Sequence, residues 1–315
     1  MSIGGSVGKA VGRAGRRALY GTRGVRAWAT RLRPRACVLV YHRVGEPTSD
    51  PFGQAVAPER FARQLDALRS RHHVMSAREL VEGLHARDYP DGSVVVTFDD
   101  GYADTLLAAY PAAAAHSVPI LVFVTAGPVA AQDDLFWWDE LSALPAAAGA
   151  AYAALHDEVR HLPAAAREAR IARLRNGGPV AREAHLGRPL TRAELAELAR
   201  MPLATIGGHT LTHPTLAALP AEEQLHELSE GRRQLEALTG AHVDFLAYPF
   251  GKEADVTGET CRLAGQAGYA AAFLSTPRAV VPSSDVFALP RLTVHDWEPE
   301  LLLRRIADVL GPVRG

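Results

Sequence analysis

Only two cysteines occur in the sequence, Cys37 and Cys261, and they lie far apart and match no spaced metal-ligand motif. A disulfide framework is therefore excluded, and two small apolar residues are the simplest interpretation. The formal net charge of −1 over 315 residues excludes a general electrostatic case for nucleic-acid binding. No run approaches the roughly 18 apolar residues expected of a membrane-spanning helix.

Acidic side chains are absent from the first 45 residues, although nine lysines and arginines occur before residue 36. Arginines interrupt every candidate for the apolar run of roughly 7–15 residues that a secretory signal requires, so no signal peptide is predicted. We expect residues 1–35 to form a basic tail that is disordered or lies on an anionic membrane surface, with Leu19, Tyr20 and Trp28 as apolar contacts. The predicted location is the cytoplasm or the inner face of the membrane.

From residue 36 onward, short strand-like runs alternate with amphipathic helical patterns. The predicted strands are Cys37–Tyr41, Val94–Phe98, Ile120–Val124, Thr205–Gly207, Phe245–Tyr248, Ala270–Leu274 and Arg291–Val294. Apolar residues three and four apart predict a helix after Pro58 and another from Glu222 to Thr239, which Gly240 should end. Strands that alternate with helices indicate a largely parallel sheet, and about seven such units are enough to close a barrel. In such a barrel the chemistry lies where the strands end.

One segment, from about residue 128 to residue 200, departs from this alternation. It is rich in alanine and arginine and lacks strand signals, so we expect a helical insertion across the barrel rather than a separate domain. Trp137 and Trp138 lie near its start. Packing residues are the simpler interpretation. The alternative is a sugar-stacking platform at the rim of the site, because aromatic faces pack well against pyranose rings.

A pair of carboxylates ends an apolar strand and is the first candidate for chemistry. Asp99 and Asp100 directly follow Val94–Phe98, and Gly101 comes next. Burying either charge without a partner would be costly, so adjacent carboxylates at a strand end favour a bound cation. The same residues also fit a solvated turn, since Asp-Gly is a turn signal, and alone this motif leaves both interpretations open.

Two histidines in the segment GGHTLTHP, residues 207–214, are the second candidate. His209 and His213 are four apart and can converge on one ion if the loop makes a helical turn, which Pro214 should end. Alone, they could be one core histidine and one solvent histidine. Combined with the Asp-Asp strand end, one carboxylate and two imidazoles leave room for water and a substrate oxygen, as catalytic metal sites require.

These two motifs resemble the first two signatures of the polysaccharide deacetylases, the NodB-homology family or carbohydrate esterase family 4. The matching segments are TFDD, residues 97–100, and HTxxH, residues 209–213. The resemblance extends from Val38 to about Val294. It implies a distorted (β/α) barrel, which we assign to residues 36–315 as an α/β fold with seven units and the helical insertion.

The resemblance also implies roles for four side chains. Asp99 would be the general base. Asp100, His209 and His213 would hold a divalent metal, most commonly zinc. Such a metal polarises the amide carbonyl and makes its bound water more acidic.

The third family motif, Arg-Pro-Pro-Tyr-Gly, is replaced here by Ala-Tyr-Pro-Phe-Gly at residues 247–251. The resemblance implies that the backbone N–H of Phe250 helps to hold the oxyanion, a role that needs no particular side chain. Ala247 takes the place of the arginine that braces the base, so another residue has to supply that charge. Arg291 and Arg43 are candidates, and each could equally be an ordinary salt-bridge arginine.

The general acid of the family is a histidine in a late Leu-x-His motif, and His295 comes one residue too late for it. The early segment YHRV, residues 41–44, resembles the subgroup that includes the biofilm poly-N-acetylglucosamine deacetylases, in which circular permutation moves the acid to the first strand. We therefore favour His42, protonated, as the acid, with a core histidine as the plainer alternative. Tyr248 and Trp138 are further candidates for contact with the substrate.

The predicted activity is metal-dependent removal of an N-acetyl group from an amino sugar in a polysaccharide, an oligosaccharide or a lipid-linked glycan. Two alternatives stay open: a deformylase or other amide hydrolase that acts on a lipid-linked amino sugar or a small amide, and a non-catalytic barrel that binds glycans. Release of acetate or of formate separates the two hydrolases. The expected partners are an N-acetylated glycan and, through the tail, an anionic membrane, but no nucleic acid.

Overall fold

Seven parallel strands form the main sheet of the computed structural model, which describes residues 34–47, 50–133, 135–176 and 187–311. The strands are β1 (Ala36–Tyr41), β4 (Ser93–Phe98), β5 (Ile120–Val124), β6 (Ala204–Gly208), β7 (Phe245–Ala247), β8 (Ala271–Phe273) and β9 (Leu292–Thr293). Each lies at a predicted strand, and the bounds differ by at most one residue at either end. The predicted tail lies outside the described residues, apart from its last two positions, and stays a prediction.

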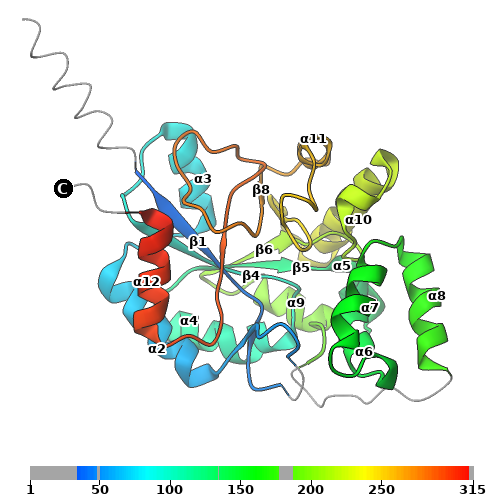
Figure 1. Cartoon of the computed structure of the whole chain (residues 1–315). Coiled ribbons are helices and arrows are strands. Elements are labelled where there is room, and N and C mark those ends of the chain that lie inside the picture. The colour runs from blue at the N-terminus through cyan, green and yellow to red at the C-terminus, as the bar shows by residue number, and fades with distance from the viewer. Residues whose placement is uncertain (1–33, 48–49, 134, 177–186, 312–315) are drawn as a thin grey trace, which may run out of the picture. The chain divides into compact units, whose positions relative to one another are not determined.

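The sheet runs in the order β8-β7-β6-β5-β4-β1-β9 and curls into a half-barrel, with helices around it (Figure 1). This confirms the distorted (β/α)7 barrel. Parallel neighbours need long connections, and most of them here contain helices. Among the described residues, the helices outside the insertion are α2 (Pro58–Arg71), α3 (Ala77–Ala86), the π-helix η1 (Thr105–Ala109), α4 (Tyr110–Ala115), the 3₁₀ turn η3 (Leu216–Ala218), α10 (Ala221–Thr239), α11 (Gly258–Gln266) and α12 (Pro299–Leu310). Among the described helices, none is long and apolar enough to cross a membrane.

Between β5 and β6 the described chain is helical, as predicted for the insertion. Its elements are α5 (Ala126–Ala131), α6 (Trp137–Ser142), the 3₁₀ turn η2 (Pro145–Ala147), α7 (Ala151–Arg160), α8 (Ala164–Arg175) and α9 (Arg192–Leu198). Helices α6, α7 and α8 lie together on one side of the sheet (Figure 1, green). They share a small core of their own, which includes Leu141, Tyr152, Val159 and Ile171.

Alternate strand residues pack on the two faces of the sheet. In β4, Val94 and Val96 join the larger apolar cluster with the surrounding helices, whereas Val95 joins a second cluster with Phe123 and Phe273. This is the period of two expected of a strand buried on both faces. The ladder is in register through β1 and β4, from Ala36 opposite Ser93 to Tyr41 opposite Phe98. The residues that follow these two strands therefore emerge side by side.

A short parallel pair, β2 (Arg43–Val44) and β3 (Ala55–Val56), lies just beyond the end of β1. The loop between its strands includes Phe52 and Gln54, which reach the pocket described below.

Candidate active site

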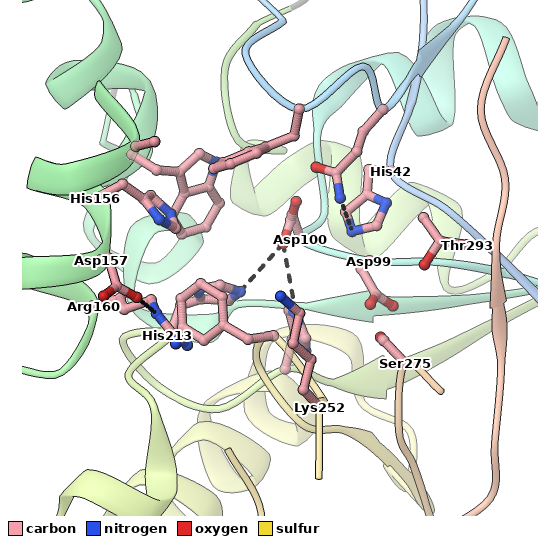
Figure 2. Close-up of a pocket in the computed structure, with 16 residues that line it drawn as sticks. His42, Asp99, Asp100, His156, Asp157, Arg160, His213, Lys252, Ser275 and Thr293 are labelled. Carbon is pink, nitrogen blue, oxygen red and sulfur yellow. Dashed lines mark hydrogen bonds and ion pairs between the residues drawn. The ribbon is translucent and has the colours of Figure 1, made fainter. Parts of the chain in front are cut away.

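A pocket of about 350 Å³ opens at the carboxyl ends of the strands, and Figure 2 shows the side chains around it. Seven of the candidate site residues line it, namely His42, Asp99, Asp100, Trp138, His209, His213 and Phe250. Arg291 lies directly behind Asp99, and Tyr248 packs in the core instead. The structure thus gathers residues from four strand ends and the insertion around one cavity.

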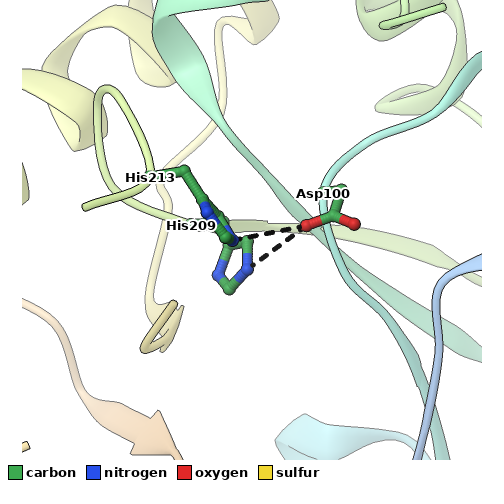
Figure 3. Close-up of side chains that lie close together, drawn as sticks. All are labelled: Asp100, His209 and His213. Atoms are coloured by element: carbon green, nitrogen blue, oxygen red, sulfur yellow. Dashed lines mark ion pairs between the residues drawn. The ribbon is translucent and has the colours of Figure 1, made fainter. Parts of the chain in front are cut away.

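Asp100 and the two histidines form a compact cluster (Figure 3). Oδ1 of Asp100 lies 3.5 Å from Nε2 of His209 and 3.5 Å from Nε2 of His213. Asp100 has a φ of 74°, a strained backbone conformation that persists where the surroundings enforce it. Gly101 follows with a φ of 88°, and a Cβ there would lie 2.9 Å from Cγ1 of Val124, so this turn requires glycine.

The cluster has the donor set of a divalent-cation site. Ligand atoms from its three residues lie within 4.8 Å of one another. Nδ1 of His209 donates to the carbonyl of Ala247 at 2.7 Å, which leaves Nε2 facing Asp100. Burial lowers the pKa of both histidines and so favours the neutral rings that metal ligation needs. Burial and the charge of Asp99 raise the pKa of Asp100 well above its usual value, and a cation would oppose both effects.

The loop from His209 to His213 does not form the predicted helical turn. Thr210 and His213 have φ values of 64° and 60°, so the loop is an irregular turn with two left-handed residues. The prediction was wrong because contacts from neighbouring helices fix the loop, and the local spacing does not reveal them.

Two buried charged side chains hold this loop through its backbone. Glu227 on α10 accepts hydrogen bonds from the N–H groups of Leu211 at 3.0 Å and Thr212 at 2.8 Å. Arg167 on α8 donates through Nη2 to the carbonyl of Thr212 at 2.7 Å. Arg167 is only 2% exposed, and within the described structure its Nε and Nη1 have no hydrogen-bond partner. Burying a cation with so few partners costs free energy. The hydrogen bond to the Thr212 carbonyl indicates that Arg167 holds the peptide next to His213.

Asp99 is held by a bidentate ion pair. Nη1 and Nη2 of Arg291 donate to its two carboxylate oxygens at 2.6 and 2.7 Å, and Arg291 is 0% exposed. Burial alone would raise the pKa of Asp99, but the Arg291 charge outweighs it and holds the pKa below its usual value. Arg291 is therefore the brace that Ala247 cannot supply. The other candidate, Arg43, pairs with Asp104 at 3.2 Å instead.

His42 directly follows β1 and lines the same pocket as Asp99. Its Nε2 lies 3.3 Å from Nε2 of Gln54, and its Nδ1 is buried without a partner in the described structure. Burial lowers the pKa of His42 to about 4, so the resting ring is neutral near pH 7, and its role as the acid stays a prediction. The less favoured candidate, His295, donates through Nδ1 to the carbonyl oxygen of Gly53 at 2.6 Å and does not line the pocket.

Phe250 lies three residues beyond the end of β7 and lines the pocket. It has a φ of 61°, so its backbone is also left-handed. No acceptor among the described residues takes a hydrogen bond from its N–H. The ring lies 4.9 Å from that of His213, and the guanidinium of Arg160 lies 4.8 Å from the Phe250 ring centroid. The N–H is thus available to an acceptor bound in the pocket.

Tyr248 does not fit the substrate contact that we predicted. It is 1% exposed and packs in the main core, and its hydroxyl donates to the carbonyl of Phe287 at 2.9 Å. The reason is the strand period, because Tyr248 directly follows β7 and turns to the helix-covered face.

Trp138 lines the pocket, but its rings are packed against other side chains. It stacks on Phe136 at 4.5 Å with an interplanar angle of 6°, and the His213 ring lies 4.4 Å away. Its Nε1 donates to the Tyr102 hydroxyl at 2.7 Å. Trp137 stacks on His156 at 5.3 Å and carries the guanidinium of Arg167 5.0 Å from a ring centroid. The geometry favours packing over the sugar-stacking alternative for both tryptophans.

Helix α7 of the insertion supplies pocket residues that the sequence analysis missed. Figure 2 shows His156, Asp157 and Arg160 opposite His42 and Asp99. Arg160 ties the insertion to the barrel loops, because Nη1 donates to Asp255 at 2.8 Å and to Thr215 Oγ1 at 3.2 Å. Other pocket residues missed were Phe52, Gln54, Ala153, Lys252, Ser275 and Thr293. Only the strand ends before Ser275 and at Thr293 gave any sequence signal for them.

The curled parallel barrel and the ionisable groups at its strand ends define the class of this protein, a barrel enzyme whose chemistry lies where the strands end. The sequence profile of the family described as polysaccharide deacetylase matches residues 86–272, more than half of the chain. The chain belongs to the polysaccharide deacetylase family and is a hydrolase of amide carbon–nitrogen bonds. No curated protein sequence gives a match.

Solved structures of deacetylases share the fold. The deacetylase PplD of Streptococcus pyogenes, in complex with acetate, superposes with a TM-score of 0.62 at 18% identity, covering 89% of this chain and 100% of that chain. IcaB from Ammonifex degensii gives 0.60 at 22% identity, with 87% and 97% covered. A de-N-acetylase from Aggregatibacter actinomycetemcomitans gives 0.59 at 15% identity, with 86% and 99% covered. The TM-scores establish similarity of fold, and at identities this low the comparison extends to the fold alone.

Proposed function

We propose that this enzyme removes N-acetyl groups from an amino sugar of a glycan and that it uses a divalent metal, zinc, held by Asp100, His209 and His213. The observation that carries the proposal is the pairing of two carboxylates in one pocket. Asp99 is neutralised by the buried Arg291, whereas Asp100 faces two neutral imidazoles. One carboxylate is thereby suited to proton transfer and the other to a cation.

When bound, the metal supplies Lewis acidity at the amide carbonyl. Asp99 accepts a proton from the attacking water, and Arg291 keeps its carboxylate ionised and fixed in orientation for that step. The N–H of Phe250 donates to the oxygen on which negative charge develops. The side chains thus divide proton removal and charge stabilisation between β4 and the loop after β7.

His42 gives a proton to the departing amine. Because burial lowers its pKa to about 4, the ring is neutral at rest and has to gain that proton within the cycle. The proton removed from water by Asp99 is the available source. Nε2 of Gln54 lies 3.3 Å from Nε2 of His42, and this contact orients the ring for the proton transfer.

The similar structures suit this substrate class. One is described as a de-N-acetylase, and PplD holds acetate, the product that N-acetyl hydrolysis releases. Acetate and formate should be measured after incubation of the zinc-loaded protein with N-acetylated and N-formylated amino-sugar oligomers. Acetate release that stops on chelation and returns with zinc supports the proposal. Formate release alone would assign a deformylase, and unaltered turnover after metal removal would contradict the metal.

We also propose that residues 1–35 form a tail ahead of the barrel and give it peripheral contact with anionic membrane at the inner face. The nine basic residues before position 36 support this, since each attracts anionic lipid by about 1 kcal/mol. Co-sedimentation with phosphatidylserine vesicles should fall when residues 1–34 are deleted. Equal binding of both forms would remove the proposal.

A further inference from the structure

An exposed phenylalanine lies at the rim of the pocket. Phe52 is 47% exposed and lines the cavity together with His42 and Asp100. Among the described residues, the other exposed large apolar side chains are Leu107 and Leu203, and neither lines it. A single exposed apolar side chain is common on a protein surface, so it is the position of Phe52 in the lining of the pocket that points to a ligand contact.

The turn that carries Phe52 is held firmly by one aspartate. The N–H of Gly53 donates to the Asp50 carbonyl at 3.1 Å. The carboxylate of Asp50 accepts from the N–H groups of Gln54 at 2.9 Å and Ala55 at 2.8 Å. A ring presented on an ordered turn loses little conformational freedom when a ligand binds.

Phe52 also contacts the insertion across the rim. Its ring centroid lies 5.0 Å from that of His156 and 5.5 Å from that of Tyr152, both on α7. The angles between the rings are 68° and 56°, so these neighbours do not stack flat on Phe52. By contrast, Trp138 stacks nearly parallel on Phe136. Of the described phenylalanine and tryptophan residues that line the pocket, Phe52 is the exposed one, whereas Trp138 and Phe250 are partly buried.

We propose that Phe52, supported by Tyr152 and His156, forms a subsite that stacks the pyranose ring of a sugar adjacent to the one being deacetylated. The apolar C–H face of a pyranose suits an aromatic ring, and the sugar hydroxyl groups stay in water. This subsite rests on the proposed function, and it predicts that the enzyme prefers an oligosaccharide to a single N-acetylated sugar.

The test compares Phe52→Ala with Phe52→Trp and with Leu107→Ala, a control that removes an equally exposed apolar side chain away from the pocket. Acetate release is measured on N-acetylglucosamine and on its β-linked pentasaccharide. We expect Phe52→Ala to raise KM for the pentasaccharide roughly 5- to 10-fold, the size of one aromatic contact, and to lower kcat/KM for the monosaccharide by clearly less. Phe52→Trp should keep more of the preference for the pentasaccharide than Phe52→Ala does, and Leu107→Ala should behave like the parent protein.

Equal losses on both substrates, or no loss on either, would overturn the subsite. Equilibrium binding of the pentasaccharide, measured by calorimetry, decides it independently of turnover. Weaker binding by Phe52→Ala alone supports the subsite even if neither sugar is deacetylated, in which case the proposed function fails. Unchanged binding refutes the subsite even if turnover is normal.

Discussion

The strand ends of the barrel and the helical insertion supply the same pocket in different ways. On the barrel side, Asp99 and Asp100 follow a strand directly, so the hydrogen-bonded ladder sets their positions. On the insertion side, His156 and Arg160 project from α7, whose position depends on a separate small core. Functional residues that directly follow a strand form a short motif that can be recognised in the sequence. Functional residues that project from packed helices form no such motif. The predictions below test how independent the two sides are.

The largest effect is expected on the barrel side, from Asp99→Asn. The amide cannot accept the proton from water, so turnover should fall about 10²–10⁴-fold, the usual contribution of a general base. Because the three proposed ligands are intact, zinc content should stay at the parental level. Acetate release and metal analysis of the purified variant check the two expectations. Turnover close to the parental value would show that Asp99 is not the base.

Ile171→Ala tests whether the insertion is stabilised separately. Ile171 is 3% exposed in the insertion core, and its truncation should cost about 2–5 kcal/mol. Hydrogen exchange should accelerate in α7 and α8 while β1 and β4 keep their protection. Leu39→Ala, in the main core, is the matched control and should accelerate exchange in the barrel. Uniform acceleration by Ile171→Ala would instead show one cooperative unit.

Arg291→Lys should lower turnover about 10- to 100-fold, because a lysine cannot reproduce the two parallel hydrogen bonds to Asp99. Arg43→Lys is the control, since Arg43 pairs with Asp104 and does not contact Asp99. Steady-state kinetics on one substrate suffices for both. A similar loss in the control would contradict the assignment of Arg291 as the brace.

The difference between strand ends and packed helices explains which features could be predicted from the sequence. All seven strands and the pocket positions of Asp99, Asp100, His209 and His213 were predicted, because each depends on a local pattern. The choice between Arg291 and Arg43 stayed open, since Arg291 meets a carboxylate 192 residues away and only the sheet order brings them together.

Residues placed by tertiary packing were missed or misjudged. Tyr248 was a candidate for contact with the substrate and lies in the core. Phe52 had no signal, because its place at the rim depends on contact with α7. The neutral resting state of His42 also depends on burial, which a motif does not report.

Arg167→Met tests whether the insertion supports the barrel cluster. Loss of the hydrogen bond to the Thr212 carbonyl should loosen the loop before His213 and weaken zinc binding about 10-fold, as expected for a residue outside the ligand set. Competition with a chelating dye measures this affinity without turnover. Arg170→Met, on the same helix but paired with the exposed Glu158, should leave it unchanged, and Arg167→Lys should restore part of it. Equal zinc affinities for all variants would show that the insertion does not support the metal ligands of the barrel.

The smallest effect concerns the return of the insertion to the barrel. The N–H of Leu190 donates to the Gly101 carbonyl at 2.9 Å, and α9 begins shortly afterwards with Thr191 as its cap. Hydrogen bonds from Arg188 and Thr191 lower the pKa of Glu194 to about 2. A lowered carboxylate pKa adds stability above the unfolded value, near 4.5, and this stability is lost as the pH falls toward 2.

Glu194→Gln should therefore reduce the free energy of unfolding by about 1 kcal/mol at pH 7, and the deficit should shrink as the pH falls from 5 toward 2. Urea denaturation across this range measures it. A deficit independent of pH would mean that hydrogen bonding, and not charge, holds the cap. Turnover at pH 7 should stay unchanged if the backbone hydrogen bond from Leu190 to Gly101 is enough to fix the position of Asp100. A fall in turnover would instead show that the cap of α9 helps to position Asp99 and Asp100. The barrel and the insertion would then not be independent where the chain returns from the insertion to the barrel.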